Sequence, residues 1–365
     1  GASCGHLLLE PQRSNLVTDS EYFGAWTNDT NTSLTANAIQ SPSGLVDAYK
    51  LIAGTSTARQ GIKFNLTPSG DLVQSFFAKK GEYSVVQITN GRNGSLYANF
   101  DLENGVLGSY QDCTPIIQEF SDGWYRCVIT YNSTLGINNT RISIAESTTQ
   151  ARLVNFAGNG SDGIYIWGAM VEEATYATSY IPTYGGSSVT RSEDNCQVED
   201  ESALINSEQG ALYFEGIAID PYSSSVVSFS DGTNSNRICL SLPQNASNIN
   251  AFSSVGGSKI NNNILHDPSV NSKYAIVWNG NSFKAFVNGV KKVDNTMAGS
   301  FSADTLTDIR FDRGDGGLNF AGFCKSYLSI ATALTDQEAI ELTTIKCSEN
   351  IHLKTKQKPT PLLRI

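Results

Sequence analysis

Apolar and polar residues alternate with a period of two in many short runs, and clusters of Gly, Asn, Asp and Ser separate these runs. Such alternation is typical of strands that bury one face. In the first half of the chain the pattern predicts strands near residues 45–52, 58–66, 71–79, 83–89, 95–101, 124–131, 140–146 and 163–171. Almost no helix is predicted there.

The alternation stops between Tyr184 and Gln209, where a Gly-Gly-Ser-Ser stretch precedes a run of three acidic residues. Such a polar, glycine-rich segment is typical of a linker. We therefore predict a first domain over 1–191, a linker over 192–208, a second domain over 209–345 and a tail over 346–365.

The second half again predicts strands, near residues 211–219, 225–230, 236–242, 249–255, 273–279, 283–287, 306–312 and 320–330. Asn279-Gly280 and Asn288-Gly289 are dipeptides that favour tight hairpin turns. Thr335 and Glu338 have the spacing of a capping box, which predicts one short helix after Leu334. The expected fold class is all-β, with two antiparallel β-sandwich (jelly-roll) domains and one short C-terminal helix.

The composition argues against two kinds of binding partner, nucleic acid and the lipid bilayer. Only 16% of the residues are charged, the net charge is -10 and the pI is near 4.8. A chain this acidic has no basic surface that could neutralise phosphates, so nucleic acid is not expected as a partner. No apolar run approaches the roughly 18 residues that span a bilayer, so membrane insertion is not expected either. Because the sequence starts without Met, we expect it to be cut from a longer polypeptide.

The residues that usually perform catalysis are scarce or badly spaced. The three histidines and seven cysteines form no ligand-spaced pair, and we expect most cysteines to be small buried side chains. A Glu-x-Asp-x-x-Glu strand is absent, and Glu172 and Glu173 would point to opposite faces of a strand. We therefore expect a protein that is not an enzyme.

Sugar recognition needs aromatic faces with polar or cationic groups beside them. Strand parity assigns Tyr125, Cys127 and Ile129 to the core, which turns the alternate side chains to the other face. The predicted binding row on that face consists of Phe77, Lys79, Trp124 and Arg126. The alternative is that Phe77 and Trp124 fill the core.

A second candidate lies in the loop Ser-Asp-Gly-Thr-Asn-Ser-Asn-Arg of the second domain. Its polar side chains could bind calcium or sugar hydroxyls, and the alternative is an ordinary Asp-Gly turn. The candidate residues are Asp231, Asn234, Asn236 and Arg237.

Several motifs in the first half resemble a module of phage tail and structural proteins. They are Leu-Leu-Leu-Glu-Pro-Gln-Arg-Ser-Asn-Leu at 7–16 with Trp26, Asp-Gly-Trp-Tyr-Arg at 122–126, Tyr-Ile-Trp-Gly-Ala-Met-Val-Glu at 165–172, Thr-Ser-Tyr-Ile-Pro-Thr at 178–183, and Thr190-Arg191. This module is similar to jelly-roll carbohydrate-binding modules, which hold sugars on a concave sheet face and in some members a structural calcium ion. Met170 departs from the pattern, because the family usually has Gln there.

The second half resembles a concanavalin A-like, laminin-G-type lectin domain. The similarity lies in Gly-Ala-Leu-Tyr-Phe-Glu at 210–215, Phe-Ser-Asp-Gly-Thr at 229–233, Phe-Lys-Ala-Phe-Val-Asn-Gly at 283–289, and the helix at 334–342.

Together the two resemblances imply a phage fibre or spike segment in the virion, assembled in the bacterial cytoplasm. It would bind host surface glycans, contact other virion proteins and form a homotrimer in the intact protein. Two alternatives stay open. One is the ancillary binding portion of a secreted polysaccharide-degrading enzyme, and the other is a virion decoration protein without a ligand.

Overall fold

The computed structural model describes residues 6–29, 32–91, 94–133, 137, 139–219, 224–243 and 247–345. The predicted tail over 346–365 lies outside the described residues. Contacts divide the chain into two compact units, a continuous N-terminal unit (Glu10–Asp194) and a C-terminal unit (Gly1–Leu9 with Asn195–Ile365). The N-terminal unit is thus inserted between two segments of the C-terminal one. The predicted bounds differ from this division, because the first domain was predicted over 1–191 and so contained residues 1–9, and the predicted linker over 192–208 belongs to the C-terminal unit from Asn195 onward.

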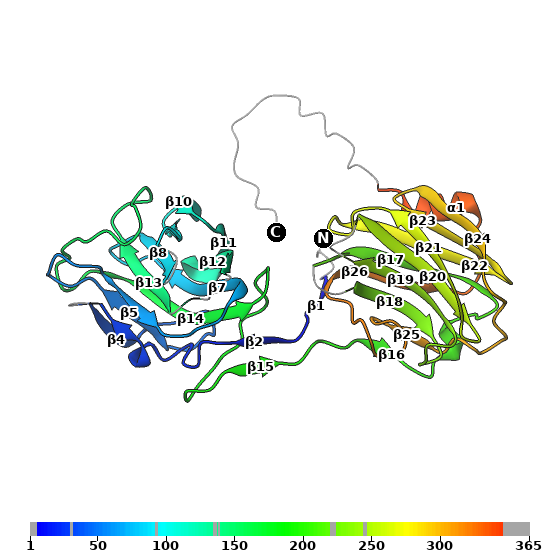
Figure 1. The fold of residues 1–365 in the computed structure, drawn as a ribbon, viewed down its shortest axis with the longest axis horizontal. Coiled ribbons are helices and arrows are strands. Elements are labelled where there is room, and N and C mark those ends of the chain that lie inside the picture. Colours follow the sequence, from blue (N-terminus) through cyan, green and yellow to red (C-terminus); the bar gives the residue numbers. More distant parts are fainter. Residues whose placement is uncertain are drawn as a thin grey trace, which may run out of the picture. The chain divides into compact units, whose positions relative to one another are not determined.

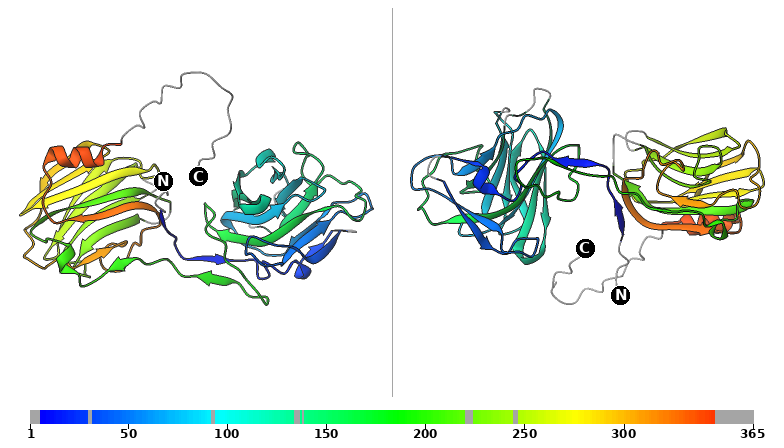
Figure 2. Two further views of the ribbon diagram at one scale, coloured as in Figure 1. Left: turned by 180° about the vertical axis from the view of Figure 1, so that it is seen from behind. Right: turned by 90° about the horizontal axis from the view of Figure 1, so that it is seen from below.

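The N-terminal unit contains two six-stranded antiparallel sheets. The β7 sheet has the order β11-β12-β7-β14-β5-β4, the β8 sheet has the order β10-β9-β8-β13-β6-β3, and β2 and β15 form a separate ribbon that is visible in Figure 2. The elements are β2 (Arg13–Asn15), η1 (Phe23–Ala25), β3 (Thr27–Asn28), β4 (Ser33–Ile39), β5 (Ala48–Ile52), β6 (Gly61–Phe64), β7 (Gly70–Lys79), β8 (Val85–Asn90), β9 (Tyr97–Asp101), β10 (Val106–Gln111), β11 (Thr114–Glu119), η2 (Ser121–Gly123), β12 (Trp124–Ser133), β13 (Thr140–Ala145), β14 (Gly163–Glu173) and β15 (Val189–Arg191).

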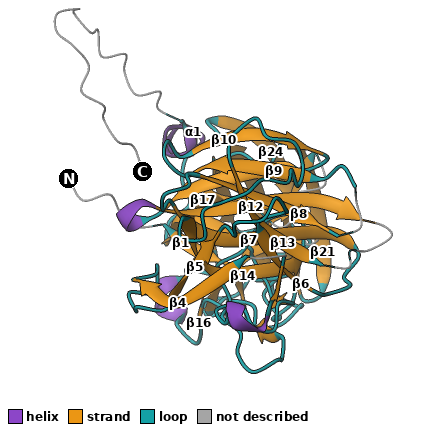
Figure 3. Cartoon of the chain, turned by 90° about the vertical axis from the view of Figure 1, so that its left-hand side faces the viewer, coloured by secondary structure: helices purple, strands orange, loops and turns teal. Residues whose placement is uncertain are grey.

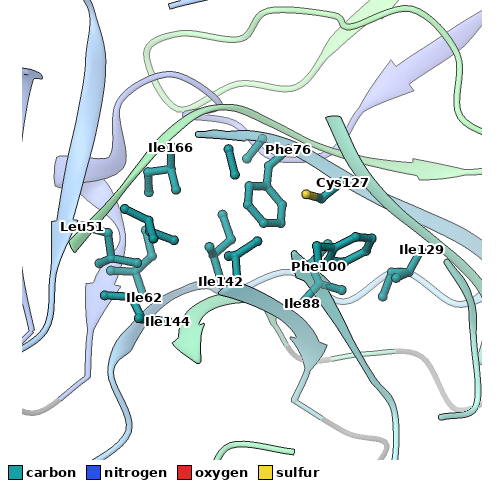
Figure 4. Close-up of a cluster of buried hydrophobic side chains, with 14 of the residues drawn as sticks. Leu51, Ile62, Phe76, Ile88, Phe100, Cys127, Ile129, Ile142, Ile144 and Ile166 are labelled. Carbon is teal, nitrogen blue, oxygen red and sulfur yellow. The ribbon is translucent and has the colours of Figure 1, made fainter. Parts of the chain in front are cut away.

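The core of this unit lies between its two sheets. Figure 4 shows Phe76, Cys127 and Ile166 of the β7 sheet facing Ile88 and Phe100 of the β8 sheet, and all five side chains are buried. The predicted parity of β12 is confirmed, because Cys127 and Ile129 belong to this core and Tyr125 packs against it.

The C-terminal unit also contains two six-stranded antiparallel sheets. The β17 sheet has the order β1-β26-β17-β22-β23-β24, and the β19 sheet has the order β16-β25-β18-β19-β20-β21. The elements are β1 (Leu7–Leu9), β16 (Gln197–Val198), η3 (Ser202–Leu204), β17 (Gln209–Ala218), β18 (Ser224–Ser230), β19 (Arg237–Pro243), β20 (Asn248–Val255), β21 (Ser258–Leu265), β22 (Ser272–Asn279), β23 (Ser282–Val287), β24 (Val290–Thr296), β25 (Asp308–Arg310), β26 (Gly322–Ile330) and α1 (Asp336–Thr343).

The short strand β1 pairs with β26 (Figure 1). In this pairing Leu7 lies opposite Cys324, and Leu9 lies opposite Gly322. Leu9 is buried in the core between the two sheets of the C-terminal unit. The N-terminal strand β1 therefore completes the sandwich of the C-terminal unit. The chain passes from one unit to the other at two places, after Leu9 and after Asp194.

The predicted fold class is confirmed, because strands dominate the chain (Figure 3). In the described residues α1 is the one α-helix, and η1, η2 and η3 are short 3-10 helices. Thr335 and Glu338 form the predicted capping box. The turn between β23 and β24 has positive φ at both Asn288 and Gly289, as a type I′ hairpin requires. No helix in the part of the chain that the structure describes is long and apolar enough to cross a membrane.

Candidate functional site

The predicted binding row of the N-terminal unit does face away from the main core, but it is not exposed. Phe77, Trp124 and Arg126 are 3%, 2% and 6% exposed, so the expectation of an outward binding row is wrong for these three residues. The two aromatic rings pack with Trp167 in a second apolar cluster, and the Trp124 indole donates to the Gln40 carbonyl at 3.1 Å. The alternative that these rings fill a core is the correct one.

Arg126 is buried because it holds the backbone that covers this sheet face. Its Nη1 donates to the carbonyl of Thr178 at 2.7 Å, and its Nη2 donates to Ser75 Oγ at 3.0 Å. Lys79 is half-buried and forms no ion pair with any described residue. The Thr-Ser-Tyr-Ile-Pro-Thr motif that begins at Thr178 is thus part of a structural clamp.

The polar loop of the C-terminal unit is mainly a turn. Asp231 Oδ1 accepts from the Thr233 amide at 2.9 Å, and its Oδ2 accepts from Asn236 Nδ2 at 2.8 Å. Burial raises the pKa of Asp231, but these hydrogen bonds outweigh it and the pKa is lowered overall. Among the described residues, no three His, Cys, Asp or Glu side chains gather into a metal site. Asp231 and Asn236 therefore close the loop, in agreement with the Asp-Gly turn alternative.

Arg237, at the end of this loop, faces the outer side of the β19 sheet. Its Nη1 donates to Asn234 Oδ1 and, at 3.0 Å, to the Arg313 carbonyl. In the strand register Arg237 lies opposite Ser254, which lies opposite Lys259 of β21. Arg237, which Asn234 holds in place, is thus the one of the four candidate residues of this loop that lies on the outer face of the β19 sheet. The sequence analysis did not predict this face as a binding surface.

Two cations flank one aromatic ring on this face. Lys259 Nζ lies 3.9 Å from the centroid of the Phe252 ring, and the Arg237 guanidinium carbon lies 5.4 Å from it. Both distances are within the range of cation–π attraction. Phe252 is only 3% exposed, so its ring supports the two cations and does not itself stack on a ligand.

The carboxylates nearby neutralise these cations only in part, because Asp315 forms an ion pair with Arg237 but no described carboxylate pairs with Lys259. Asp315 binds Arg313 at 2.6 Å, and this hydrogen bond holds the pKa of Asp315 at about 2. Arg237 is 4.0 Å from Asp315, and Lys259 has no carboxylate partner among the residues that the structure describes. Partial burial and the Arg237 charge lower the pKa of Lys259. This face is therefore locally positive in a protein whose net charge is -10.

Amide side chains continue the face along β20 and β21. Asn261 lies opposite Phe252, and Asn263 lies opposite Asn250, so these side chains share the outer side of the sheet. Asn261 and Asn263 are exposed, and Asn250 donates to Asn263 Oδ1 at 3.0 Å. We call this surface the Lys259 face; it consists of Arg237, Asn250, Phe252, Lys259, Asn261 and Asn263.

Two buried polar atoms of the Lys259 face lack a hydrogen-bond partner. They are Arg237 Nε, a donor, and Asn250 Oδ1, an acceptor. Both atoms are shielded from solvent, so the groups of this face that a polar ligand can reach are the exposed Lys259 ammonium and the exposed amides of Asn261 and Asn263. Asn, Lys and Arg groups of this kind bind hydroxyl and carboxylate groups.

The sequence prediction missed β21 and with it Lys259, Asn261 and Asn263. Three consecutive asparagines hide the alternation, because Asn262 occupies an inward position between Ile260 and Ile264. The Gly256-Gly257 pair, which joins β20 to β21 with positive φ at both residues, was the local feature that could have indicated a hairpin here.

No protein-family model and no curated protein sequence matches the chain. Among solved structures, the CBM40 of Ruminococcus gnavus IT-sialidase bound to α2,3-sialyllactose has 17% identity and a TM-score of 0.34, over 41% of this chain and 96% of its own. A heptameric SAP-like pentraxin from Limulus polyphemus has 11% identity and a TM-score of 0.32, over 38% and 70%. Domains LG4-5 of the mouse laminin α1 chain have 10% identity and a TM-score of 0.27, over 95% and 99%. At scores this low, the fold assignment of the chain depends on its own strand pairing.

Proposed function

We propose that the chain is a non-enzymatic glycan-binding segment of a bacteriophage fibre or spike, and that the Lys259 face is one of its binding surfaces. The observation that carries the proposal is that Lys259 and Arg237 flank Phe252 beside an exposed amide row, while Lys259 has no carboxylate partner in the described part of the chain. The motifs that resemble phage tail modules support the fibre or spike context.

The shape of the site suits an extended polysaccharide. Side chains on one face of a strand repeat about every 7 Å, so Lys259, Asn261, Asn263 and Leu265 follow one another over roughly 20 Å. The amides bind sugar hydroxyls, and Lys259 binds an acidic group on the same chain. Each contact is weak, and several copies in a trimeric particle would add up through avidity.

Binding is tested with the full chain and an acidic bacterial polysaccharide, by isothermal titration calorimetry. Lys259→Ala should weaken binding about tenfold or more, because a lost charged hydrogen bond costs about 1.5–3 kcal/mol. Lys292→Ala is the matched control, since Lys292 is an exposed lysine of the other sheet without an ion pair among the described residues. Equal affinities of Lys259→Ala and the parent would refute the site.

The two other parts of the proposal have their own tests. Incubation with the bound polysaccharide should release no new reducing ends, and turnover that depends on one carboxylate would contradict the non-enzymatic assignment. Antibodies against the chain should label fibres or spikes on phage particles encoded by the same genome. Labelling confined to secreted protein would favour the accessory portion of an enzyme.

A further inference from the structure

We infer that the C-terminal unit carries a second binding groove, for an uncharged saccharide, on the outer side of the β17 sheet beside α1. The groove consists of two cavities that share Asn279, and we call it the Asn279 groove. The inference shares only its class of ligand with the proposed function, because the Lys259 face belongs to the β19 sheet. It holds or fails independently of that face.

Three polar side chains form a row across neighbouring strands of the β17 sheet. Gln209 of β17 lies opposite Asn279 of β22, and Asn279 lies opposite Ser282 of β23. The adjacent residues Trp278 and Phe283 belong to the core between the two sheets. Because side chains alternate along a strand, the row faces outward, with about 4.8 Å between neighbouring strands.

The first cavity lies between this row and the start of α1. It has a volume of about 330 Å³, and the partly exposed residues Ala333 and Leu334 form its apolar wall. Lys284 is the one cation among the described residues that line it, and its ammonium group binds Asp336 at 2.7 Å. This cavity therefore offers apolar surface and neutral polar groups, because its one cation is already paired.

The second cavity adjoins the first at Asn279 and is polar. It also has a volume of about 330 Å³, and its polar lining residues include Asn206, Glu208, Gln209 and Ser300. The Gly280 amide donates to the Glu208 carbonyl at 2.9 Å, which fixes the β22–β23 turn against the segment before β17. The Glu208 carboxylate is the one charged group on the described lining of this cavity.

The polar side chains of the Asn279 groove are accessible to a ligand. Glu208, Asn279 and Ser300 are exposed, and Gln209 and Ser282 are partly exposed. None of these five side chains forms a hydrogen bond or an ion pair with another residue in the described part of the chain. A ligand can therefore bind them without breaking a contact that the fold requires.

The combination points to an uncharged saccharide. Concave sites with an apolar wall and a few polar groups are typical of small-molecule binding. The amides and hydroxyls of the groove can both donate to and accept from sugar hydroxyls, and the Glu208 carboxylate accepts from them. An acidic sugar is disfavoured, because Glu208 repels it and Lys284 is already bound to Asp336. The Asn279 groove and the Lys259 face thus favour sugars of different charge.

The experiment titrates the full chain with glucose, galactose, N-acetylglucosamine and glucuronic acid at matched ionic strength. Binding is followed in NMR spectra through the side-chain amide signals of Gln209 and Asn279, while those of Asn261 and Asn263 report separately on the Lys259 face. At least one of the neutral sugars should shift the Gln209 and Asn279 signals. Glucuronic acid should bind there about fivefold more weakly or less. A negative result at the Lys259 face leaves this measurement unaffected.

Two substitutions locate the site. Asn279→Ala should weaken binding of the neutral sugar about fivefold or more at an unchanged melting temperature, because the lost amide has no described partner in the protein. Glu208→Gln should strengthen binding of glucuronic acid about threefold or more, because it removes a like charge.

Asn281→Ala is the matched control, since Asn281 is an exposed amide of the same turn that lines neither cavity. Its affinity should equal that of the parent. The inference is overturned if no neutral sugar shifts the Gln209 and Asn279 signals, if Asn279→Ala binds as tightly as the parent, or if the parent prefers glucuronic acid at this groove.

Discussion

Arg126 and Glu172 bind the same residue from the two strands that flank β7. The Arg126 guanidinium donates to the Thr178 carbonyl at 2.7 Å, and the Glu172 carboxylate accepts from the Thr178 amide at 3.2 Å. Glu10 adds a third contact, because its carboxylate accepts from the Ser179 amide at 2.7 Å. Arg126, Glu172 and Glu10 thus fasten one covering segment to the β7 sheet.

Arg126→Ala should destabilise the N-terminal unit by about 3–5 kcal/mol, because it removes two buried hydrogen bonds of a charged group, each worth about 1.5–3 kcal/mol. Urea denaturation measures this loss. Lys79→Ala, in the adjacent strand, should change the free energy of unfolding by less than about 0.5 kcal/mol. If Arg126→Ala unfolds at the parent's urea concentration, the clamp does not contribute to stability.

Asp315 should make the stability of the C-terminal unit depend on pH below 4. Its folded-state pKa is about 2 because Arg313 binds it, and its ordinary value is 3.8. A depressed pKa contributes stability that is present above pH 3.8 and is lost as the pH falls through 2. The free energy of unfolding of the parent should therefore approach that of Asp315→Asn between pH 4 and 2. A difference that stays constant over this range would contradict the assignment.

Leu9→Ala should destabilise the C-terminal unit by about 2–5 kcal/mol, because it empties a buried position in the core between its sheets. Leu7→Ala is the matched control, since Leu7 belongs to the same strand and is 42% exposed. Hydrogen exchange of β26 amides measures the effect. Faster exchange in the N-terminal unit alone would show that β1 does not support β26.

Binding at the Lys259 face should weaken as salt is added. Raising NaCl from about 0.1 M to 1 M shortens the Debye length from about 10 Å to about 3 Å, which screens the exposed ammonium group. Titration of an acidic polysaccharide at both concentrations tests this. Affinity for a neutral glycan should change little, and equal salt effects on both glycans would exclude Lys259 as the discriminating group.

The alternation of apolar and polar residues was sufficient to predict most strands. It was not sufficient to predict which faces of those strands are exposed to solvent. The parity of β12 follows from its own alternation, whereas the burial of Arg126 depends on the segment around Thr178, about 50 residues later in the chain. β21 was missed because Asn262 takes an inward position, where Asn295 and the Ala251 carbonyl satisfy its amide. These contacts join residues that are distant in sequence, and a single sequence does not display them.

The pairing of β1 with β26 constrains the order in which the two sandwiches can fold while the protein is synthesised. Gly322 is translated 313 residues after its partner Leu9. At about 5–20 residues per second, β1 waits roughly 15–60 s before its hydrogen-bonding partner leaves the ribosome. The inserted sandwich is complete within that interval and can fold first. The outer sandwich closes last, around a strand that was made about 300 residues earlier.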